Sequence, residues 1–328
     1  MTRPVSGGSV AGLVTLAEIE AAGERISGRV RRTPLLPTGL GPPERPLLLK
    51  AECLQETGSF KARGAANAIA LLTPAERERG VVTHSSGNHG RAVAWAARAA
   101  GLAATVVMPK ETPAVKRAAV EALGAEVVYV DAAERADEVE RLRSRTGATP
   151  VPPYDHPAVI AGQGTVGLEI VEDLPEIGCV FVPVSGGGLV SGIATAVKAL
   201  RPVARVIGVE PALAGDLAEG FARREHVAWT VSQTSRTIAD GLRVPTVGDL
   251  PWAHIRAYVD DVVTVTEEQI RAAMRAVALD AKVVAEPSGA VAVAGALAHG
   301  QLGAGGPAVA VVSGGNVDPA LLAEVLAG

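Results

Sequence analysis

Short runs rich in valine and isoleucine alternate with longer helical runs along most of this chain, and this alternation constrains the fold more than any other feature. The apolar runs lie at 46–52, 81–84, 105–108, 126–130, 180–184, 206–209, 261–265 and 309–312. Helical runs lie between most of them, at 90–100, 113–123, 133–145, 158–173, 190–200, 267–282 and 288–298. Such strands are expected in parallel sheets that helices cover on both faces. The sequence therefore predicts an α/β protein with two open, mainly parallel sheet domains.

The length of 328 residues, 48% of them hydrophobic, suits two domains rather than one. Residues 81–150 hold three strand–helix units and are predicted to form a small domain. Residues 1–80 and 151–328 are predicted to form a larger one. Hinges are expected near 73–80 and in the proline-rich stretch 149–153.

Composition excludes several classes of partner. The net charge is −4, the isoelectric point is near 5.9, and lysine and arginine are scattered, so neither nucleic acid nor an anionic membrane is an expected partner. No apolar run of about 18 residues is present and the first residues lack the pattern of a signal peptide. Cys53 and Cys179 are far apart and lack metal-ligand spacing, which favours reduced core thiols and a cytoplasmic location.

Lys61 stands in an unusual place for a cation. It lies in Ser59-Phe60-Lys61 at the start of a helical run from 60 to 72, with Ser59 as the expected N-cap. The partial positive charge of a helix N-terminus disfavours an ammonium group. A lysine with a lowered pKa is a nucleophilic amine that can form a Schiff base with a carbonyl compound. The alternative is an ordinary surface lysine.

Two turns between a strand and a helix have the composition of anion sites. Ser85-Ser86-Gly87-Asn88-His89-Gly90 offers hydroxyls, an amide and backbone N–H groups suited to a carboxylate, although a polar turn with an N-cap explains it too. Ser185-Gly186-Gly187-Gly188-Leu189 exposes backbone N–H groups suited to a phosphate, and three glycines are a poor choice for a mere turn. The run 186–192 misses the dinucleotide pattern G-x-G-x-x-G by one residue.

Two further segments follow predicted strands. Ser313-Gly314-Gly315-Asn316 comes after the last strand, where ligands of open parallel sheets bind, and its neutral hydroxyl could meet a ring nitrogen. A glycine turn is the alternative. Glu210 and Asp216 flank a turn and could hold a hard cation such as Mg²⁺ or Ca²⁺, or form a solvated acidic loop.

The motifs occur in the order seen in fold-type II pyridoxal-phosphate enzymes, the tryptophan synthase β-like fold. They are Ser59-Phe60-Lys61, the 85–90 segment, the 186–188 loop, Thr237-Ile238-Ala239-Asp240-Gly241, Glu286-Pro287-Ser288 and the 313–316 segment. From the helix near Thr15 to its C-terminus the chain closely resembles the threonine/serine dehydratase and serine racemase branch. The resemblance implies that the large domain binds the cofactor and the small domain the substrate.

The resemblance also implies a role for each matching position. Lys61 would hold pyridoxal 5'-phosphate as a Schiff base and then take the Cα proton of the substrate. The cofactor phosphate would be bound by Ser185, Gly186, Gly187, Gly188 and Leu189, although this family often has glycine where Ser185 stands. Asn88 would bond the ring 3'-oxygen, Phe60 would flank the ring and Ser313 would face its nitrogen. Glu286 and Asn316 would also belong to the cofactor site.

Substrate and metal roles follow in the same way. Ser85, Ser86, Asn88 and His89 would hold the substrate carboxylate. Ser86 matches the position at which racemases of the branch carry a second proton donor. Glu210, the Ala214 carbonyl and Asp216 match a divalent site of the racemases, which implies Mg²⁺ or Ca²⁺.

The expected activity is dehydration and deamination of L-threonine or L-serine to a 2-oxo acid and ammonia. Serine racemase and 3-hydroxyaspartate ammonia-lyase are alternatives of the same fold, as is a dehydratase of a less common hydroxy amino acid. A nicotinamide-dependent oxidoreductase built on the 186–188 loop and Glu210, and a binding protein without cofactor, are alternatives of other classes. A homodimer is the default expectation for a soluble enzyme.

Overall fold

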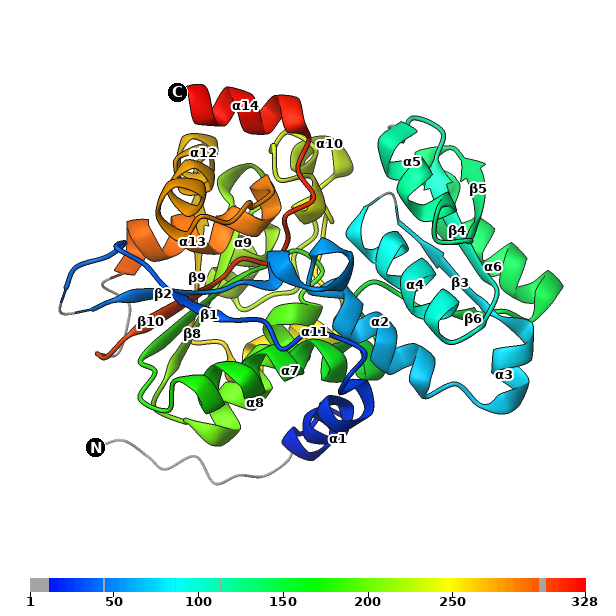
Figure 1. Ribbon diagram of the computed structural model, residues 1–328, viewed down its shortest axis with the longest axis horizontal. Coiled ribbons are helices and arrows are strands. Elements are labelled where there is room, and N and C mark those ends of the chain that lie inside the picture. The colour runs from blue at the N-terminus through cyan, green and yellow to red at the C-terminus, as the bar shows by residue number, and fades with distance from the viewer. Residues whose placement is uncertain (1–11, 44, 86, 113, 301–304) are drawn as a thin grey trace.

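The computed structural model describes residues 12–43, 45–85, 87–112, 114–300 and 305–328, and it contains two sheets (Figure 1). The six-stranded sheet has the order β1 (Leu35–Pro37), β2 (Leu47–Lys50), β10 (Ala308–Val311), β7 (Cys179–Pro183), β8 (Arg205–Pro211) and β9 (Asp261–Val265). The four-stranded sheet has the order β5 (Glu126–Val130), β4 (Ala104–Pro109), β3 (Val81–His84) and β6 (Thr149–Pro150). Neighbouring strands are parallel except for the antiparallel pair β1 and β2.

Helices fill most of the connections between the strands. They are α1 (Leu16–Ile26), α2 (Lys61–Ala70), α3 (Pro74–Arg79), α4 (Asn88–Ala99), α5 (Ala114–Glu121), α6 (Arg135–Thr146), α7 (Pro157–Asp173), α8 (Gly188–Leu200), α9 (Asp216–Arg223), α10 (Val231–Thr234), α11 (Asp249–Tyr258), α12 (Glu267–Ala276), α13 (Pro287–His299) and α14 (Pro319–Ala327). None of the described helices is long and apolar enough to cross a membrane.

Both faces of the six-stranded sheet are buried at its centre, where β10 and β7 are apolar at every position. In β7, Phe181 packs into the core on the side of α12 and α13, whereas Val180 and Val182 pack on the side of α7, α8 and α11. All three side chains are fully buried. Successive side chains of a strand point to opposite faces, so a continuous apolar run needs a layer of helices on each side. The predicted α/β fold with mainly parallel sheets is confirmed.

Several elements were not expected from the sequence. The strands β1 and β6 are very short and contain proline, so they carry little strand pattern. The stretch 73–80, where a hinge is expected, contains the helix α3 (Pro74–Arg79). Thr73 and Glu76 form a reciprocal capping box there, Pro74 occupies the first turn, and Gly80 ends the helix with a φ of 75°. These local signals specify a short helix rather than a loop.

Helix α2 packs between the two sheets (Figure 1). Its residues Ala65 and Ile69 share a core with β3 and α4, which belong to the four-stranded sheet, and with Val159 of α7. The four-stranded sheet itself is built only from residues between 81 and 150. The division of the chain into domains stays a prediction, with α2 lying against both parts.

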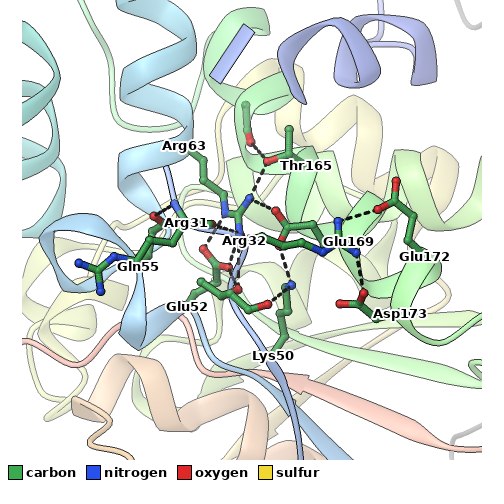
Figure 2. A network of polar contacts seen from close by, with 12 residues as sticks. Arg31, Arg32, Lys50, Glu52, Gln55, Arg63, Thr165, Glu169, Glu172 and Asp173 are labelled. Carbon is green, nitrogen blue, oxygen red and sulfur yellow. Dashed lines mark hydrogen bonds and ion pairs between the residues drawn. The ribbon is translucent and has the colours of Figure 1, made fainter. Parts of the chain in front are cut away.

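A buried network of charges holds the first turn of α2 (Figure 2). Arg63 makes two bonds of 2.8 Å to the carboxylate of Glu52 and bonds of 2.6 and 2.9 Å to that of Glu169. Lys50 binds Glu169 at 2.6 Å and the carbonyl of Thr33 at 2.8 Å. Burial opposes the ionisation of Glu52, but the charge and hydrogen bonds of Arg63 hold its pKa below the usual value. Two cations and two carboxylates therefore compensate one another inside the protein.

Replacing Arg63 by methionine should destabilise the fold by about 3–5 kcal/mol, because Glu52 would remain buried without the cation that binds it and Glu169 would keep only Lys50. Arg32 offers a matched control, since it pairs with Glu172 and Asp173 while its side chain is 51% exposed. Arg32→Met should cost at most about 1 kcal/mol. Denaturant titration at constant cofactor saturation measures both, and equal small losses would contradict the structural role of the network.

Candidate active site

The segment that precedes Lys61 is bound to the end of β10. Ser59 has an extended backbone and forms an antiparallel bridge with Gly314, and the N–H of Phe60 donates to the carbonyl of Ser313 at 3.1 Å. Helix α2 begins at Lys61 with Phe60 as the N-cap residue and without a side-chain cap. The expectation that Ser59 caps this helix is therefore wrong, because pairing with Gly314 holds Ser59 outside the helix.

Lys61 is partly buried, and its amine hydrogen-bonds one group among the described residues. Its Nζ donates to the carbonyl of Pro153 at 2.6 Å and lies 5.0 Å from the centre of the Phe60 ring. Burial lowers the pKa of Lys61 to about 8. A substantial fraction of the side chain is therefore a neutral amine near physiological pH, which is the nucleophilic form.

The glycine turn between β7 and α8 has no room for side chains. A Cβ on Gly186 would lie 2.2 Å from the ring of Tyr154, and one on Gly188 would lie 3.0 Å from the Cα of that tyrosine. Gly187 has a φ of 88°, and a Cβ there would lie 2.7 Å from Pro251. All three positions thus need glycine, and the turn presents bare backbone.

This turn also supplies hydrogen-bond donors. Helix α8 begins at Gly188, no side chain of the described residues caps it, and its first internal bond runs from Ser191 N–H to Gly187. The N–H groups of Gly188, Leu189 and the following residue thus have no acceptor within the helix. A helix N-terminus of this kind suits a phosphate, so the loop fits the phosphate of the expected cofactor. The hydroxyl of Ser185 accepts the N–H of Val244 at 3.3 Å.

Asn88, Glu286 and Asn316 meet although they lie far apart in the sequence. Asn88 Nδ2 donates to Glu286 Oε1 at 2.6 Å, and Asn316 Nδ2 donates to Asn88 Oδ1 at 2.7 Å. Burial, together with the charge of Asp240, raises the pKa of Glu286 to about 8. Glu286 is therefore mainly an uncharged carboxylic acid at pH 7.

Ser313 is buried just beyond β10, and its hydroxyl donates to the carbonyl of Ser288 at 3.5 Å. The oxygen keeps lone pairs for a further partner. A hydroxyl at this place is neutral at every physiological pH, as the expected contact to the ring nitrogen requires.

The candidate carboxylate site lies at the start of α4. Ser85 Oγ accepts the N–H of Gly87 at 3.2 Å, and Gly87 caps the helix without a side-chain bond. The His89 Nε2 lies 2.8 Å from the carbonyl of Val151, so this nitrogen carries the proton. Burial and the charge of Lys61 lower the pKa of His89 to about 3. A neutral His89 side chain offers a carboxylate no positive charge, so only the backbone N–H of His89 is expected to bind the substrate carboxylate. Ser86, also expected at this site, lies outside the described residues.

The three expected metal ligands are buried near the end of β8. Glu210, Ala214 and Asp216 are each at most 2% exposed. Glu210 Oε2 accepts the N–H of Ala218 at 2.8 Å, whereas Asp216 Oδ2 has no partner among the described residues. Burial and the charge of Asp216 raise the pKa of Glu210, and burial also raises that of Asp216. No described cluster of three acidic, histidine or cysteine side chains is present here or elsewhere, so a cation would need the Ala214 carbonyl and water as further ligands.

Comparison with known proteins agrees with this geometry. Residues 26–314 match the model of the pyridoxal-phosphate dependent enzyme family. An L-threonine ammonia-lyase of Thermotoga maritima is 42% identical over 96% of this chain and 78% of its own length. A serine racemase of Oryza sativa subsp. indica is 41% identical over 94% of this chain and 92% of its own. The solved structure of processed threonine deaminase isoform 2 from Solanum lycopersicum is similar with a TM-score of 0.86 and 35% identity, covering 95% of this chain and 92% of that one.

The chain belongs to the family of pyridoxal-phosphate dependent enzymes, as the family match and the relatives above 40% identity show. Its two mainly parallel sheets are those of fold type II within that family.

Sequence reasoning missed three groups that the structure adds to the site. Tyr154 covers the glycine turn, Pro153 accepts from Lys61, and Arg91 donates to Asn316 at 2.8 Å. Pro153 ends the proline-rich stretch 149–153, which indicated only a hinge, and Tyr154 follows it directly. Arg91 had a usable signal, because it lies three residues after Asn88 in α4 and thus on the same helix face.

The lowered pKa of Lys61 predicts an unusual pH profile for amine modification of the cofactor-free protein. Only the neutral amine reacts, so labelling of Lys61 should reach half its maximal rate near pH 8. Lys110 is an internal reference, since it is exposed and its pKa is raised by its hydrogen bond to Asp131. Peptide mass spectrometry after brief labelling measures both residues. Coincident profiles for Lys61 and Lys110 would show that burial does not shift the pKa of Lys61.

Proposed function

We propose that this enzyme deaminates L-threonine or L-serine by β-elimination. Water is first lost across Cα and Cβ, and hydrolysis of the resulting imine then consumes one water and releases ammonia and a 2-oxo acid. The observation that carries the proposal is the presence in one chain of a partly neutral amine at Lys61 and of a phosphate turn whose central residues, 186–188, are three glycines without room for side chains. Relatives named threonine ammonia-lyase and threonine dehydratase match nearly the whole chain and support this choice of substrate.

The residues of the chain divide the work among them. When bound, pyridoxal phosphate withdraws electrons from the substrate Cα and makes its proton removable. Lys61 would hold the cofactor and later accept the Cα proton at Nζ, which its lowered pKa allows. The N–H groups of the glycine turn would bind the phosphate, Asn88 would donate to the ring oxygen, and Ser313 would place its neutral hydroxyl at the ring nitrogen. Phe60, whose ring lies beside Lys61 Nζ, would flank the ring.

The substrate carboxylate would bind at the N-terminus of α4. The backbone N–H groups of Asn88 and His89 lie in its first turn, and no described side chain caps that turn. Ser85 stands beside it and supplies a hydroxyl. The positive end of the α4 helix dipole favours an anion, as does that of α8 at the phosphate turn. The role of Ser86 as a second proton donor, the homodimer and the cytoplasmic location stay predictions from the sequence.

Lys61→Ala should abolish both turnover and the visible absorbance band of the bound cofactor, because no amine remains at this place. Lys110→Ala is the control, as Lys110 is exposed on the four-stranded sheet's side and pairs with Asp131 on the surface. Absorbance spectra and release of 2-oxo acid measure the outcome. A Lys61→Ala protein that keeps the band and full activity without added amine would refute the assignment.

The substrate itself is tested with L-threonine, L-serine, D-serine and the diastereomers of 3-hydroxyaspartate, assayed for both oxo acid and inversion. The proposal expects release of oxo acid from L-threonine or L-serine to dominate. Dominant inversion of serine would favour the racemase alternative, which relatives named serine racemase keep open.

We further propose that Glu210, Asp216 and the carbonyl of Ala214 bind Mg²⁺ or Ca²⁺. Two buried carboxylates, one with an oxygen lacking any described partner, are unfavourable together unless a cation or protons compensate them. Oxygen ligands of this kind suit a hard divalent ion. The folded chain alone brings the three ligands together, so bound metal would stabilise it.

Chelation should therefore lower the melting temperature, and Mg²⁺ or Ca²⁺ should restore it. Asp216→Asn should remove this response to metal, whereas Asp249→Asn should keep it, because the Asp249 side chain is 94% exposed. Calorimetry with and without chelator measures all three proteins. A wild-type melting curve that chelation leaves unchanged would rule out the metal site.

A further inference from the structure

Four polar side chains form one continuous chain of hydrogen bonds beside the candidate cofactor site. Arg91 Nη1 donates to Asn316 Oδ1 at 2.8 Å, Asn316 Nδ2 donates to Asn88 Oδ1 at 2.7 Å, and Asn88 Nδ2 donates to Glu286 Oε1 at 2.6 Å. Arg91 and Asn88 lie one turn apart on α4, whereas Glu286 precedes α13 and Asn316 follows β10. The chain thus joins a helix of the four-stranded sheet to segments that belong to the six-stranded sheet.

The guanidinium of Arg91 fixes the direction of every bond in this chain. A guanidinium only donates, so Asn316 must turn its oxygen toward Arg91. The Asn316 Nδ2 then uses both hydrogens, one for Asn88 and one for the carbonyl of Thr57 at 2.9 Å. Asn88 must in turn present its oxygen to Asn316 and its nitrogen to Glu286. One N–H of Asn88 has no acceptor among the residues that the structure describes.

Two glycines leave the space that this chain of side chains occupies. A Cβ on Gly58 would lie 2.6 Å from Asn316 Oδ1. A Cβ on Gly314 would lie 2.1 Å from Glu286 Oε1 and 3.2 Å from Asn88 Nδ2. The surrounding backbone therefore accommodates these side chains only because both positions lack a side chain of their own.

We propose that Arg91 and Asn316 are positioning residues that lock the amide of Asn88, so that its free N–H is available to the ring oxygen of the cofactor. This inference rests on the proposed function. In this inference Asn316 acts on Asn88 and not directly on the cofactor, because its oxygen accepts from Arg91 and both its amide hydrogens are donated within the protein. A donor at the ring oxygen favours its ionised form. Loss of the lock should therefore change both affinity for the cofactor and the spectrum of the bound cofactor.

Three variants of α4 separate this role from general loss of a charge. Arg91→Met removes the donor, Arg91→Gln keeps an amide donor without the charge, and Arg98→Met is the control on the same helix. Arg98 is exposed and donates to the carbonyl of Ala122 at 3.2 Å. The dissociation constant of pyridoxal phosphate is measured by absorbance titration of the cofactor-free proteins. The ratio of the long-wavelength band to the near-ultraviolet band is measured at saturation.

Arg91→Met should raise the dissociation constant about fivefold, the effect of one lost hydrogen bond, and lower the band ratio. Arg91→Gln should recover most of the wild-type affinity and most of the wild-type band ratio. Arg98→Met should match the wild type in both quantities. Failure of the wild type to bind pyridoxal phosphate would refute the proposed function itself. A wild type that binds, with Arg91→Met unchanged in affinity and band ratio, would overturn only the inference. A lower melting temperature of cofactor-free Arg91→Met with unchanged binding would overturn it too, since the role would then be purely structural.

Asn316→Asp keeps the test decisive if Arg91→Met does not fold. Aspartate has the shape of asparagine and still accepts from Arg91, but it cannot donate to Thr57 or Asn88. The lock is then lost although the hydrogen bond with Arg91 becomes an ion pair. The inference expects weaker cofactor binding and a lower band ratio, and wild-type values for both would overturn it.

Discussion

The pairing of the 57–60 segment with the end of β10 is the contact on which the site depends. Phe60 N–H bonds Ser313, Gly315 N–H bonds Gly58 at 2.9 Å, and Ser59 bridges to Gly314. These bonds place the start of α2 next to the residues that follow β10. On the other side, Arg63 ties the first turn of α2 to the buried network of Figure 2. Lys61 therefore lies between two anchored neighbours, Phe60 and Arg63, which restrict the movement of its backbone.

Burial gives the site its chemistry, because it shifts titratable groups toward their neutral forms. The pKa of Lys61 falls to about 8, that of His89 falls to about 3, and that of Glu286 rises to about 8. Each shift follows from the cost of moving a charged group out of water. Lys61 and Glu286 would both titrate just above neutral pH, so the amine and the carboxylic acid can each exchange a proton near physiological conditions. His89 stays neutral throughout this range.

The sequence predicted the parallel strands of both sheets except β6, because each of them contains a short run rich in valine or other apolar residues, whereas β6 has only two residues, one of them proline. It also predicted a lowered pKa of Lys61 and a turn of bare backbone at 186–188. Only the family resemblance placed Asn88, Glu286 and Asn316 in one site, and the cofactor roles of all these residues stay predictions. The sequence could not predict that the oxygen and both amide hydrogens of Asn316 form hydrogen bonds within the protein. These bonds depend on a contact between Arg91, in α4 beside the four-stranded sheet, and a segment that follows β10 of the six-stranded sheet. Nor could it predict the backbone bridge that removes Ser59 from its expected capping role. Contacts between distant segments leave no periodic pattern in a sequence.

Both candidate anion sites are formed by backbone N–H groups at helix N-termini. The candidate phosphate and carboxylate sites are the N-termini of α8 and α4, which follow β7 and β3 in different sheets, and no described side chain caps either helix. Backbone N–H groups cannot lose a proton at physiological pH, so these anion sites keep their strength as pH changes. Side chains such as Lys61 are then free of anion binding and can be neutral. A lysine that had to hold the phosphate would have to stay charged and could not serve as the base. The separation of anion binding by backbone from proton transfer by side chains would allow a single lysine to act as both nucleophile and base.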